Sequence, residues 1–418
     1  MQAEISSLKE SDTPSMQAAS YVLPSAAPAP VSAPADDAAS KVSIASLLGP
    51  ITISGFGDVY YGYDYNHPED NESGLRNFEA PTNSFAFNMA ELILDKPADA
   101  SSAESRLGYH VSAAYGQAAK VVNESDSNFT DHSNFYVKEA YFDYLAPIGK
   151  GLTITVGKFV TPIGAEVIES NANWNYSRSL LFYYAIPYFH FGASAKYAFN
   201  PKIAVTGYLV NGWNNTVIDH YTELGNSSGL TYGVSLAYTP NAKWSVIENY
   251  FAGPVVDAYN DSSESYVPVT DWKQLSDTVI GYTPNSKWAF QLNGDYGFGP
   301  RFYSEDEPPV EGPATKWWGV AGYAKYTWTP KTNFAVRYEY YDDTNGYTGL
   351  ISEGEPGFAQ EVTGTYSYNL TSALLVRAEY RYDFASQPIF AKSTDGFVKE
   401  QNTAYLSFVY SFSSANLK

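Results

Sequence analysis

Apolar and polar side chains alternate at every second position along most of the chain after residue 50. The last of these runs places apolar side chains at alternate positions from Ala404 to Phe412, with mainly smaller or polar residues between them. Successive side chains of a β-strand point to opposite faces, so this pattern predicts strands with one apolar face. About sixteen runs follow it, at residues 51–63, 85–95, 105–116, 135–145, 152–160, 190–199, 202–212, 229–238, 243–252, 272–282, 287–298, 315–328, 332–342, 358–368, 373–384 and 401–412.

A short turn motif recurs between these runs. The sequence from Tyr238 to Trp244 reads YTPNAKW and the sequence from Tyr282 to Trp288 reads YTPNSKW, with looser copies at 328–334 and 199–202. Proline cannot continue a central strand and asparagine tolerates turn conformations, so each copy predicts a tight turn between two strands. About two strands fit between successive copies, whereas a propeller blade would need four. The repeat therefore favours a hairpin array closed into a membrane barrel.

The lengths of the connections alternate along the chain. Short turns follow the even-numbered predicted strands, and long connections follow the odd-numbered ones. With both ends of the chain on the short-turn side, that side is predicted to be periplasmic and the eight long loops extracellular. We therefore expect an all-β fold, a transmembrane antiparallel β-barrel of about 16 strands with short periplasmic turns and long extracellular loops.

Charged residues in the predicted strands occupy the face opposite to the apolar set. In the run 373–384, aliphatic and aromatic side chains share one face, while charged residues fill alternate positions from Arg377 to Asp383. A charge facing lipid at mid-bilayer costs about 2–4 kcal/mol, so the charged face should point inward, into an aqueous lumen. The predicted pore-lining charges are Asp58, Glu91, Glu139, Asp143, Lys325, Arg337, Glu339, Arg377, Glu379, Arg381 and Asp383.

Composition supports a membrane barrel and excludes several functions. Aromatic residues make up 16% of the 418 residues, and tyrosine and tryptophan favour the membrane interface. The absence of cysteine excludes a lipid-anchor cysteine, disulfides and covalent haem attachment. The net charge of -20 argues against a nucleic-acid partner. Five histidines without metal-ligand spacing give no support for catalysis, a metal or a cofactor.

Residues 1–48 differ from the rest of the chain, because proline, alanine and serine dominate them without periodicity. We expect a disordered periplasmic arm here and a barrel over residues 49–418. The arm could be a plain tether or a docking segment for a periplasmic protein partner. No basic and apolar export segment is visible at its start, so the signal peptide is expected to lie outside this numbering.

Two segments carry a family resemblance. Residues 48–63 read LGPITISGFGDVYYGY, and a second segment runs from GKFVTPIGAE at 157–166 to NYSRSLLF at 175–182. Both resemble the OmpL-like β-barrel porin family of Gram-negative outer membranes. The resemblance implies an outer-membrane barrel of porin type and names no substrate. The aromatic C-terminal strand, which ends near Phe412, similarly resembles the insertion signal that barrel-assembly machinery reads.

The connection from Thr161 to Phe189 is the longest, and it is unusually aromatic for a loop. It has the same ordinal position as the third extracellular loop that folds into the lumen of sixteen-stranded porins. We expect it to form the pore constriction, with Glu166, Glu169 and Arg178 at the narrowest point. The alternative is an outward loop that packs on its own aromatic residues or on a neighbouring subunit.

Two electrostatic arrangements are compatible with the charges of the lumen. Inward basic residues concentrate late in the chain and inward acids early, so two opposite walls could set a transverse field that orients dipolar solutes. Alternatively, Glu339, Glu379 and Asp383, which alternate with the arginines, could neutralise the basic wall through cross-strand ion pairs.

These features predict a passive outer-membrane channel for small hydrophilic solutes in a Gram-negative bacterium, with a weak cation preference from its acidity. Outer-membrane lipid, lipopolysaccharide and the barrel-assembly machinery are the expected partners, and analogy with other sixteen-stranded porins suggests a homotrimer. Two other functions fit the same pattern. One is a scaffold that encloses or docks an electron-transfer or export component, and the other is a closed structural surface barrel.

Overall fold

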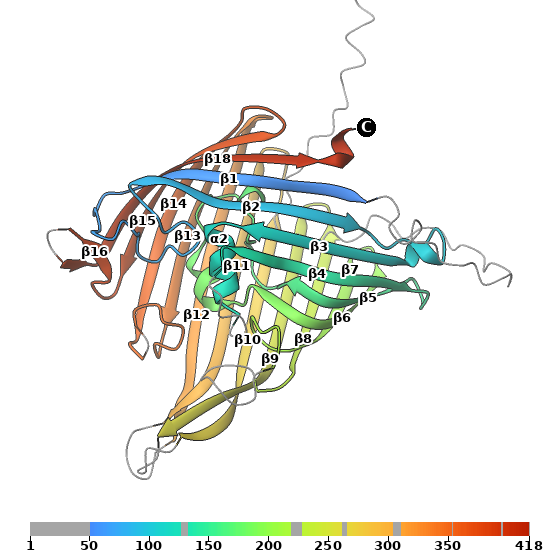
Figure 1. Cartoon of the computed structure of the whole chain (residues 1–418), viewed down its shortest axis with the longest axis horizontal. Helices are drawn as coiled ribbons and strands as arrows, with labels where there is room; N and C mark the ends of the chain where they lie inside the picture. The colour runs from blue at the N-terminus through green and yellow to red at the C-terminus, as the bar shows by residue number, and fades with distance from the viewer. Residues whose placement is uncertain are drawn as a thin grey trace, which may run out of the picture.

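The computed structural model describes residues 51–126, 133–218, 228–260, 266–303, 311–352, 354–393 and 396–417. Within them, sixteen strands pair antiparallel with their neighbours and close into one barrel, in which the first strand meets the last (Figure 1). The strands are β1 (Thr52–Asp64), β2 (Ser84–Lys96), β3 (Leu107–Tyr115), β4 (Phe135–Ala146), β5 (Leu152–Val160), β6 (Phe189–Asn200), β7 (Ile203–Val210), β8 (Thr231–Asn241), β9 (Trp244–Asn260), β10 (Tyr266–Tyr282), β11 (Trp288–Tyr303), β12 (Glu311–Thr329), β13 (Thr332–Asp343), β14 (Gly357–Asn369), β15 (Leu374–Ala385) and β18 (Glu400–Ser413). The predicted fold class is confirmed, and the predicted arm of residues 1–48 lies outside the described residues.

The connections fall into two groups. Those after even-numbered strands define the short-turn end of the barrel, and those after odd-numbered strands define the long-loop end. Loop one comprises residues 65–83, and loop two contains the helix α2 (Gln117–Glu124). Loop three comprises residues 161–188 and includes the short helices η2 (Ser170–Ala172) and η3 (Leu181–Ala185). No helix among these described residues is long and apolar enough to cross a bilayer.

The repeated turn motif forms a continuous rim at the short-turn end. Tyr282 stacks on Trp244 with ring centres 4.2 Å apart, and Trp288 lies 4.7 Å from Tyr326 on the next strand. The turns are also linked by backbone hydrogen bonds of 2.7–2.8 Å, from Thr239 N to Lys202 O, from Thr283 N to Lys243 O and from Thr327 N to Lys287 O. The repeat therefore places interfacial aromatic side chains at one depth and joins each hairpin to the one before it.

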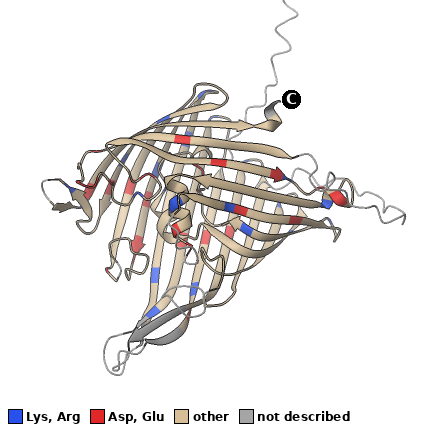
Figure 2. Cartoon of the chain, in the orientation of Figure 1, with Lys and Arg blue, Asp and Glu red and all other residues tan. Residues whose placement is uncertain are grey.

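Burial alternates along the strands as the sequence pattern predicts. In β18, Thr403 and Ser407 are buried on the inner face, whereas Leu406, Phe408 and Phe412 are exposed on the outer face. Acidic and basic positions occur along the strands of the barrel wall as well as in the loops (Figure 2). The outer face is therefore mainly apolar, as contact with lipid requires, and the inner face carries most of the charges. Glu248 of β9 is an exception on the outer face, where it accepts from Ser276 Oγ at 2.9 Å and Thr278 Oγ1 at 2.5 Å.

The structure adds elements that the pattern did not predict. Strands β9–β12 extend further at the long-loop end, where Pro254 pairs in register with Trp272 and Pro268 with Ala258. These prolines lie in a ribbon beyond the regular alternation, where a missing amide costs little. The connection between β15 and β18 contains a small hairpin of β16 (Phe390–Lys392) and β17 (Gly396–Val398). Such short elements within loops carry little periodicity of their own.

Candidate functional site

Loop three crosses the inside of the barrel. Near its start, Gly164 N donates to Asp277 Oδ2 of β10 at 3.2 Å, and Ala165 N donates to Asn293 Oδ1 of β11 at 2.9 Å. Further along, Ser170 Oγ donates to Asp58 Oδ2 of β1 at 2.7 Å. Because β10 and β1 are well separated around the barrel, one loop that contacts both must pass through the lumen.

The middle of loop three is held by carboxylates of the barrel wall. Tyr176 N and Ser177 N donate to the two oxygens of Glu379 on β15, at 2.5 and 2.8 Å. Leu180 N and Leu181 N donate to the two oxygens of Glu339 on β13, at 2.6 Å each. Each glutamate thus captures two successive backbone amides, in the geometry of a charge-assisted hydrogen bond.

The two amides between these pairs also reach carboxylates. Arg178 N donates to Glu79 Oε1 of loop one at 3.0 Å, and Ser179 N donates to Glu166 Oε2 of loop three at 2.7 Å. Six consecutive amides, from residue 176 to residue 181, therefore bind four glutamates. Buried amides need partners, and here side-chain carboxylates replace the partners that a helix or a sheet would supply.

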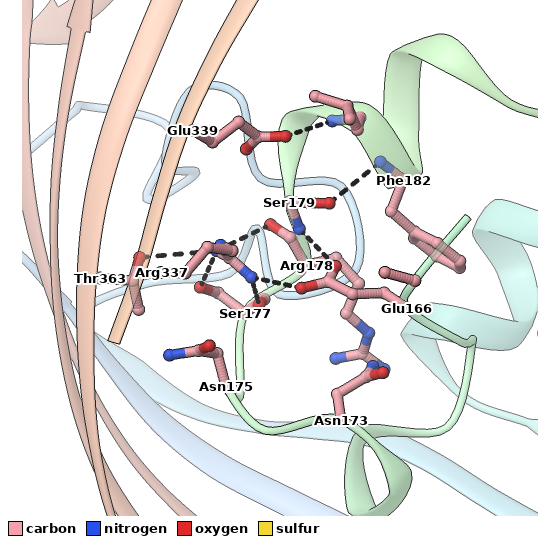
Figure 3. Close-up of polar contacts among 12 residues, drawn as sticks. Glu166, Asn173, Asn175, Ser177, Arg178, Ser179, Phe182, Arg337, Glu339 and Thr363 are labelled. Atoms are coloured by element: carbon pink, nitrogen blue, oxygen red, sulfur yellow. Dashed lines mark hydrogen bonds and ion pairs between the residues drawn. The ribbon is translucent and has the colours of Figure 1, made fainter. Parts of the chain in front are cut away.

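Arginines of the wall bind the carbonyl groups of the same loop. Arg337 Nη1 donates to Ser177 O at 2.6 Å, between Glu166 and Thr363 (Figure 3). Arg381 Nη1 donates to Arg178 O at 2.6 Å. Arg377 donates from Nη1 to Ser170 O at 2.6 Å and from Nη2 to Asn173 O at 2.9 Å. The wall therefore binds both the donors and the acceptors of the loop backbone.

Ion pairs neutralise most of this arginine wall. Arg337 Nε lies 2.5 Å from Glu361 Oε1 on β14, and its Nη1 lies 2.7 Å from Glu166 Oε1. Arg381 Nε donates to Asp383 Oδ1 at 2.9 Å. These contacts favour the ion-pair arrangement over an uncompensated basic wall, although Glu339 and Glu379 serve the loop amides instead of the arginines.

Loop one contacts loop three and the barrel wall through buried charged residues. Arg76 of loop one forms a buried ion pair with Asp383 on β15. Glu79 accepts from Arg178 N and lies 3.5 Å from Arg178 Nη1. Burial raises the pKa of the Glu79 carboxyl, while the nearby guanidinium groups of Arg178 and Arg76 oppose that rise. The two loops thus form one packed body within the barrel.

The opposite wall carries a smaller charged cluster. Lys138 of β4 lies 2.7 Å from Glu91 on β2 and 3.5 Å from Glu139, and it forms an ion pair with Glu169 of loop three. Asp143 accepts from Thr155 Oγ1 at 2.6 Å. The acidic early strands therefore attach to loop three through a shared lysine.

The three predicted constriction residues all lie in loop three, but they differ in exposure. Glu166 and Arg178 are 6% and 3% exposed, so in this structure they attach the loop and do not face an aqueous path. The side chain of Glu169 is 19% exposed, which makes it the most accessible of the three. Lys325, predicted to line the pore, places its Nζ 4.6 Å from the ring centre of Trp174 in loop three.

Sequence reasoning missed several residues that attach loop three. Asp277 and Asn293 bind its first residues, Glu361 pairs with Arg337, and Glu79 binds the amide of Arg178. The two residues of β10 and β11, together with Glu361, have the inward parity that identified the other charges, so the alternation could have found them. Glu79 lies in a loop without periodicity, and no sequence signal identifies it.

The lumen is filled at the level of loop three. Inward-facing polar residues on strands all around the barrel are fully buried there, among them Asp58, His190, Asp277, Arg337 and Thr403. His190 is held by Thr161, the carbonyl of Gly212 and a stacked Phe251 ring. Loop three and its neighbours therefore cover inward-facing polar side chains on several sides of the described barrel.

This chain matches one protein-family model and is similar in fold to several solved structures. A family model described as "Putative beta-barrel porin-2, OmpL-like" matches residues 50–412. The outer membrane channel DcaP of Acinetobacter baumannii is 12% identical, with a TM-score of 0.54, over 87% of this chain and 97% of that one. The anion-selective porin from Comamonas acidovorans is 11% identical, with a TM-score of 0.56, over 87% and 99%.

A third solved structure is similar to the same degree. OmpF of Salmonella typhi, in complex with daunomycin, is 12% identical, with a TM-score of 0.55, over 87% of this chain and 97% of that one. At such identities the similarity shows a shared fold. A search of curated protein sequences found no match.

Proposed function

The chain belongs to the OmpL-like β-barrel porin family, and from this premise we propose that it is an outer-membrane channel for small hydrophilic solutes, constricted by loop three. The observation that carries the proposal is the capture of six consecutive loop amides by carboxylates inside a polar lumen. A loop fixed in this way narrows the lumen and selects small solutes by size. Charged and polar walls keep the remaining path wet.

The proposal includes an orientation and a set of partners. The short-turn end faces the periplasm, the long loops face outward, and the apolar outer face contacts outer-membrane lipid and lipopolysaccharide. Phe412 lies on the outer face of the last strand, where the assembly machinery can read it as an insertion signal. A homotrimer is part of the proposal, since one solved neighbour, OmpT of Vibrio cholerae, is described in a trimer form. The arm of residues 1–48 remains a candidate handle for a periplasmic partner.

Planar-bilayer recording of the purified, refolded chain tests the channel directly. We expect a steady single-channel conductance that is small for a sixteen-stranded barrel, because loop three fills most of the lumen. In a salt gradient, the reversal potential should show a mild cation preference, because acids dominate the β1–β4 side and ion pairs neutralise the arginine side. Correctly folded barrels that give no conductance would contradict the channel function.

A closed barrel is the second candidate function. The complete burial of inward polar residues around the lumen at the level of loop three favours it. A closed structural barrel gives no conductance in any variant that keeps loop three in place. A scaffold that encloses or docks a partner would in addition retain that partner, with extra mass or colour, when it is purified from its own membrane.

A further inference from the structure

A cavity of about 700 Å³ lies among the loops of the long-loop end, and we call it the outer vestibule. Loop one, helix α2 and the loops that follow β7, β13 and β15 contribute to its walls, and residues 183–188 of loop three complete it. Cavities of this size hold organic solutes of drug or disaccharide size. The outer vestibule therefore lies where an incoming solute would pause before it reaches loop three.

Two tyrosines of loop three give the outer vestibule an aromatic surface. The Tyr183 and Tyr184 rings meet edge to face with centres 4.5 Å apart, and Tyr184 stacks on Tyr341 at 5.9 Å. Both tyrosines are half-buried and line the cavity, so part of each ring remains available to a solute. An aromatic ring of this kind packs well against the C–H face of a solute, while its hydroxyl remains a hydrogen-bonding group.

The aromatic surface is fixed before any solute arrives. Tyr183 and Tyr184 belong to η3, and the amides of Leu180 and Leu181 at its start are held by Glu339 of the barrel wall. The immobilised backbone removes much of the ordering cost that a flexible loop would add on binding. The constriction and the outer vestibule are therefore built on one rigid segment.

The charges of the lining exclude an anion site. Lys120 pairs with Glu124 one turn further along α2, at 3.5 Å, and Arg76 pairs with Asp383. Both basic residues that line the described part of the cavity are thus neutralised, and the lining keeps two exposed acids of loop one, Asp70 and Glu72. What remains for a solute is mainly a set of neutral hydrogen-bonding groups.

Planar amide side chains are prominent in that neutral set. Asn77, Gln117 and Asn214 line the cavity. The side-chain oxygen of Asn214 accepts from Tyr188 N at 2.6 Å and from Phe189 N at 3.3 Å, so Asn214 offers a solute only its amide donors, whereas Gln117 offers donors and an acceptor on one plane. Adjacent hydroxyl groups on a ring present matching donors and acceptors at similar spacing. Aromatic faces together with planar amides, in a described lining whose two basic residues are both paired, are the chemistry that recognises a sugar.

We propose that the outer vestibule binds a neutral polyhydroxylated solute, a saccharide of about disaccharide size, before the solute passes loop three. The inference rests on the proposed channel function and names its substrate class. Pyranose C–H faces pack on Tyr183 and Tyr184, and the ring hydroxyls bind the amide side chains of the walls.

Calorimetric titration of the detergent-solubilised, full-length chain tests this binding without any need for conductance. The probes are maltose and sucrose, with glucose 6-phosphate as the anionic comparison and choline as the cationic one. We expect saturable binding of at least one neutral disaccharide and weaker binding of both charged probes. The Tyr183→Ala variant should weaken disaccharide binding roughly tenfold, the equivalent of one lost stacking contact.

Two further variants make the result specific. Tyr65→Ala removes an exposed tyrosine of loop one outside the outer vestibule and should leave binding unchanged. Gln117→Ala removes an amide from α2 and should weaken binding even if Tyr183→Ala disturbs loop three. Three outcomes would overturn the proposal. The first is the absence of saturable disaccharide binding, the second is wild-type affinity in both Tyr183→Ala and Gln117→Ala, and the third is preferential binding of choline.

The sugar could be a free solute or the carbohydrate of lipopolysaccharide, and two arms of the titration separate these sources. Binding of free disaccharide in detergent assigns a transported solute, whereas binding only to isolated lipopolysaccharide core oligosaccharide assigns a lipid ligand. The channel function is judged separately. Sugar binding without conductance would support the binding site and contradict the channel function. Conductance without sugar binding would support the channel function and contradict the binding site.

Discussion

Replacement of Arg337 by alanine is expected to destabilise the barrel by about 3–5 kcal/mol, because it leaves buried carboxylates without their cation. The guanidinium lies 2.5 Å from Glu361 and 2.7 Å from Glu166, and all three side chains are buried. The loss should lower the temperature at which the barrel unfolds in detergent, read as the loss of heat-modifiable migration on a gel.

The matched control is Arg301→Ala, which removes an exposed arginine of β11 that is absent from this network. This variant should unfold at the wild-type temperature. If Arg337→Ala unfolded at the same temperature as the wild type and Arg301→Ala, the buried ion pairs of Arg337 would contribute little to stability, and other contacts would hold loop three.

The double variant Glu339→Gln with Glu379→Gln is expected to raise the single-channel conductance several-fold. Each glutamate accepts from two loop amides, one on each oxygen. A glutamine keeps one neutral oxygen acceptor and replaces the other oxygen by an NH2 group, which is a donor and cannot accept from the second amide. Hydrogen bonds to charged groups contribute about 1.5–3 kcal/mol each, so the loss should allow segment 176–181 to leave the wall. The current should become larger and noisier.

Glu400→Gln is the control for this measurement, because Glu400 is exposed at the start of β18. Its conductance should equal that of the wild type. An unchanged current in the double variant, with the barrel still folded, would mean that the carboxylates do not hold the loop in the conducting state.

The barrel could be predicted because lipid and lumen impose opposite demands on every strand. A run such as 401–412 must place apolar side chains outward and mainly small or polar ones inward along its whole length. Each strand can therefore be recognised in the sequence by this alternation. The repeated turns were equally informative, because each copy both closes a hairpin and joins the turn before it. Beyond the membrane this constraint ends, and the extension that contains Pro254 and Pro268 was not predicted.

The candidate site could be predicted only in part. Inward parity identified Arg337, Glu339 and Glu379, but these side chains bind backbone groups of loop three. Because almost every residue has the same backbone groups, the sequence does not show which of them take part in such contacts. The assignment of Glu166 and Arg178 to the constriction stays a prediction, and the contacts that attach loop three bury both side chains. Of the three acids expected to neutralise the arginine wall, Asp383 pairs with Arg381, whereas Glu339 and Glu379 bind loop amides. The partner of Arg337 on the wall is Glu361, which was not predicted.

Thiol modification of a single engineered cysteine tests most directly whether loop three lines the conducting path. The chain has no cysteine of its own, and Ala172→Cys changes a half-buried residue of η2 in loop three with little change in size. A charged methanethiosulfonate reagent, with labelling confirmed by mass, should lower the current at this position. The same label at Ser101→Cys, which is exposed on the connection between β2 and β3, should leave the current unchanged. Full labelling at position 172 with an unaltered current would contradict the constriction by loop three.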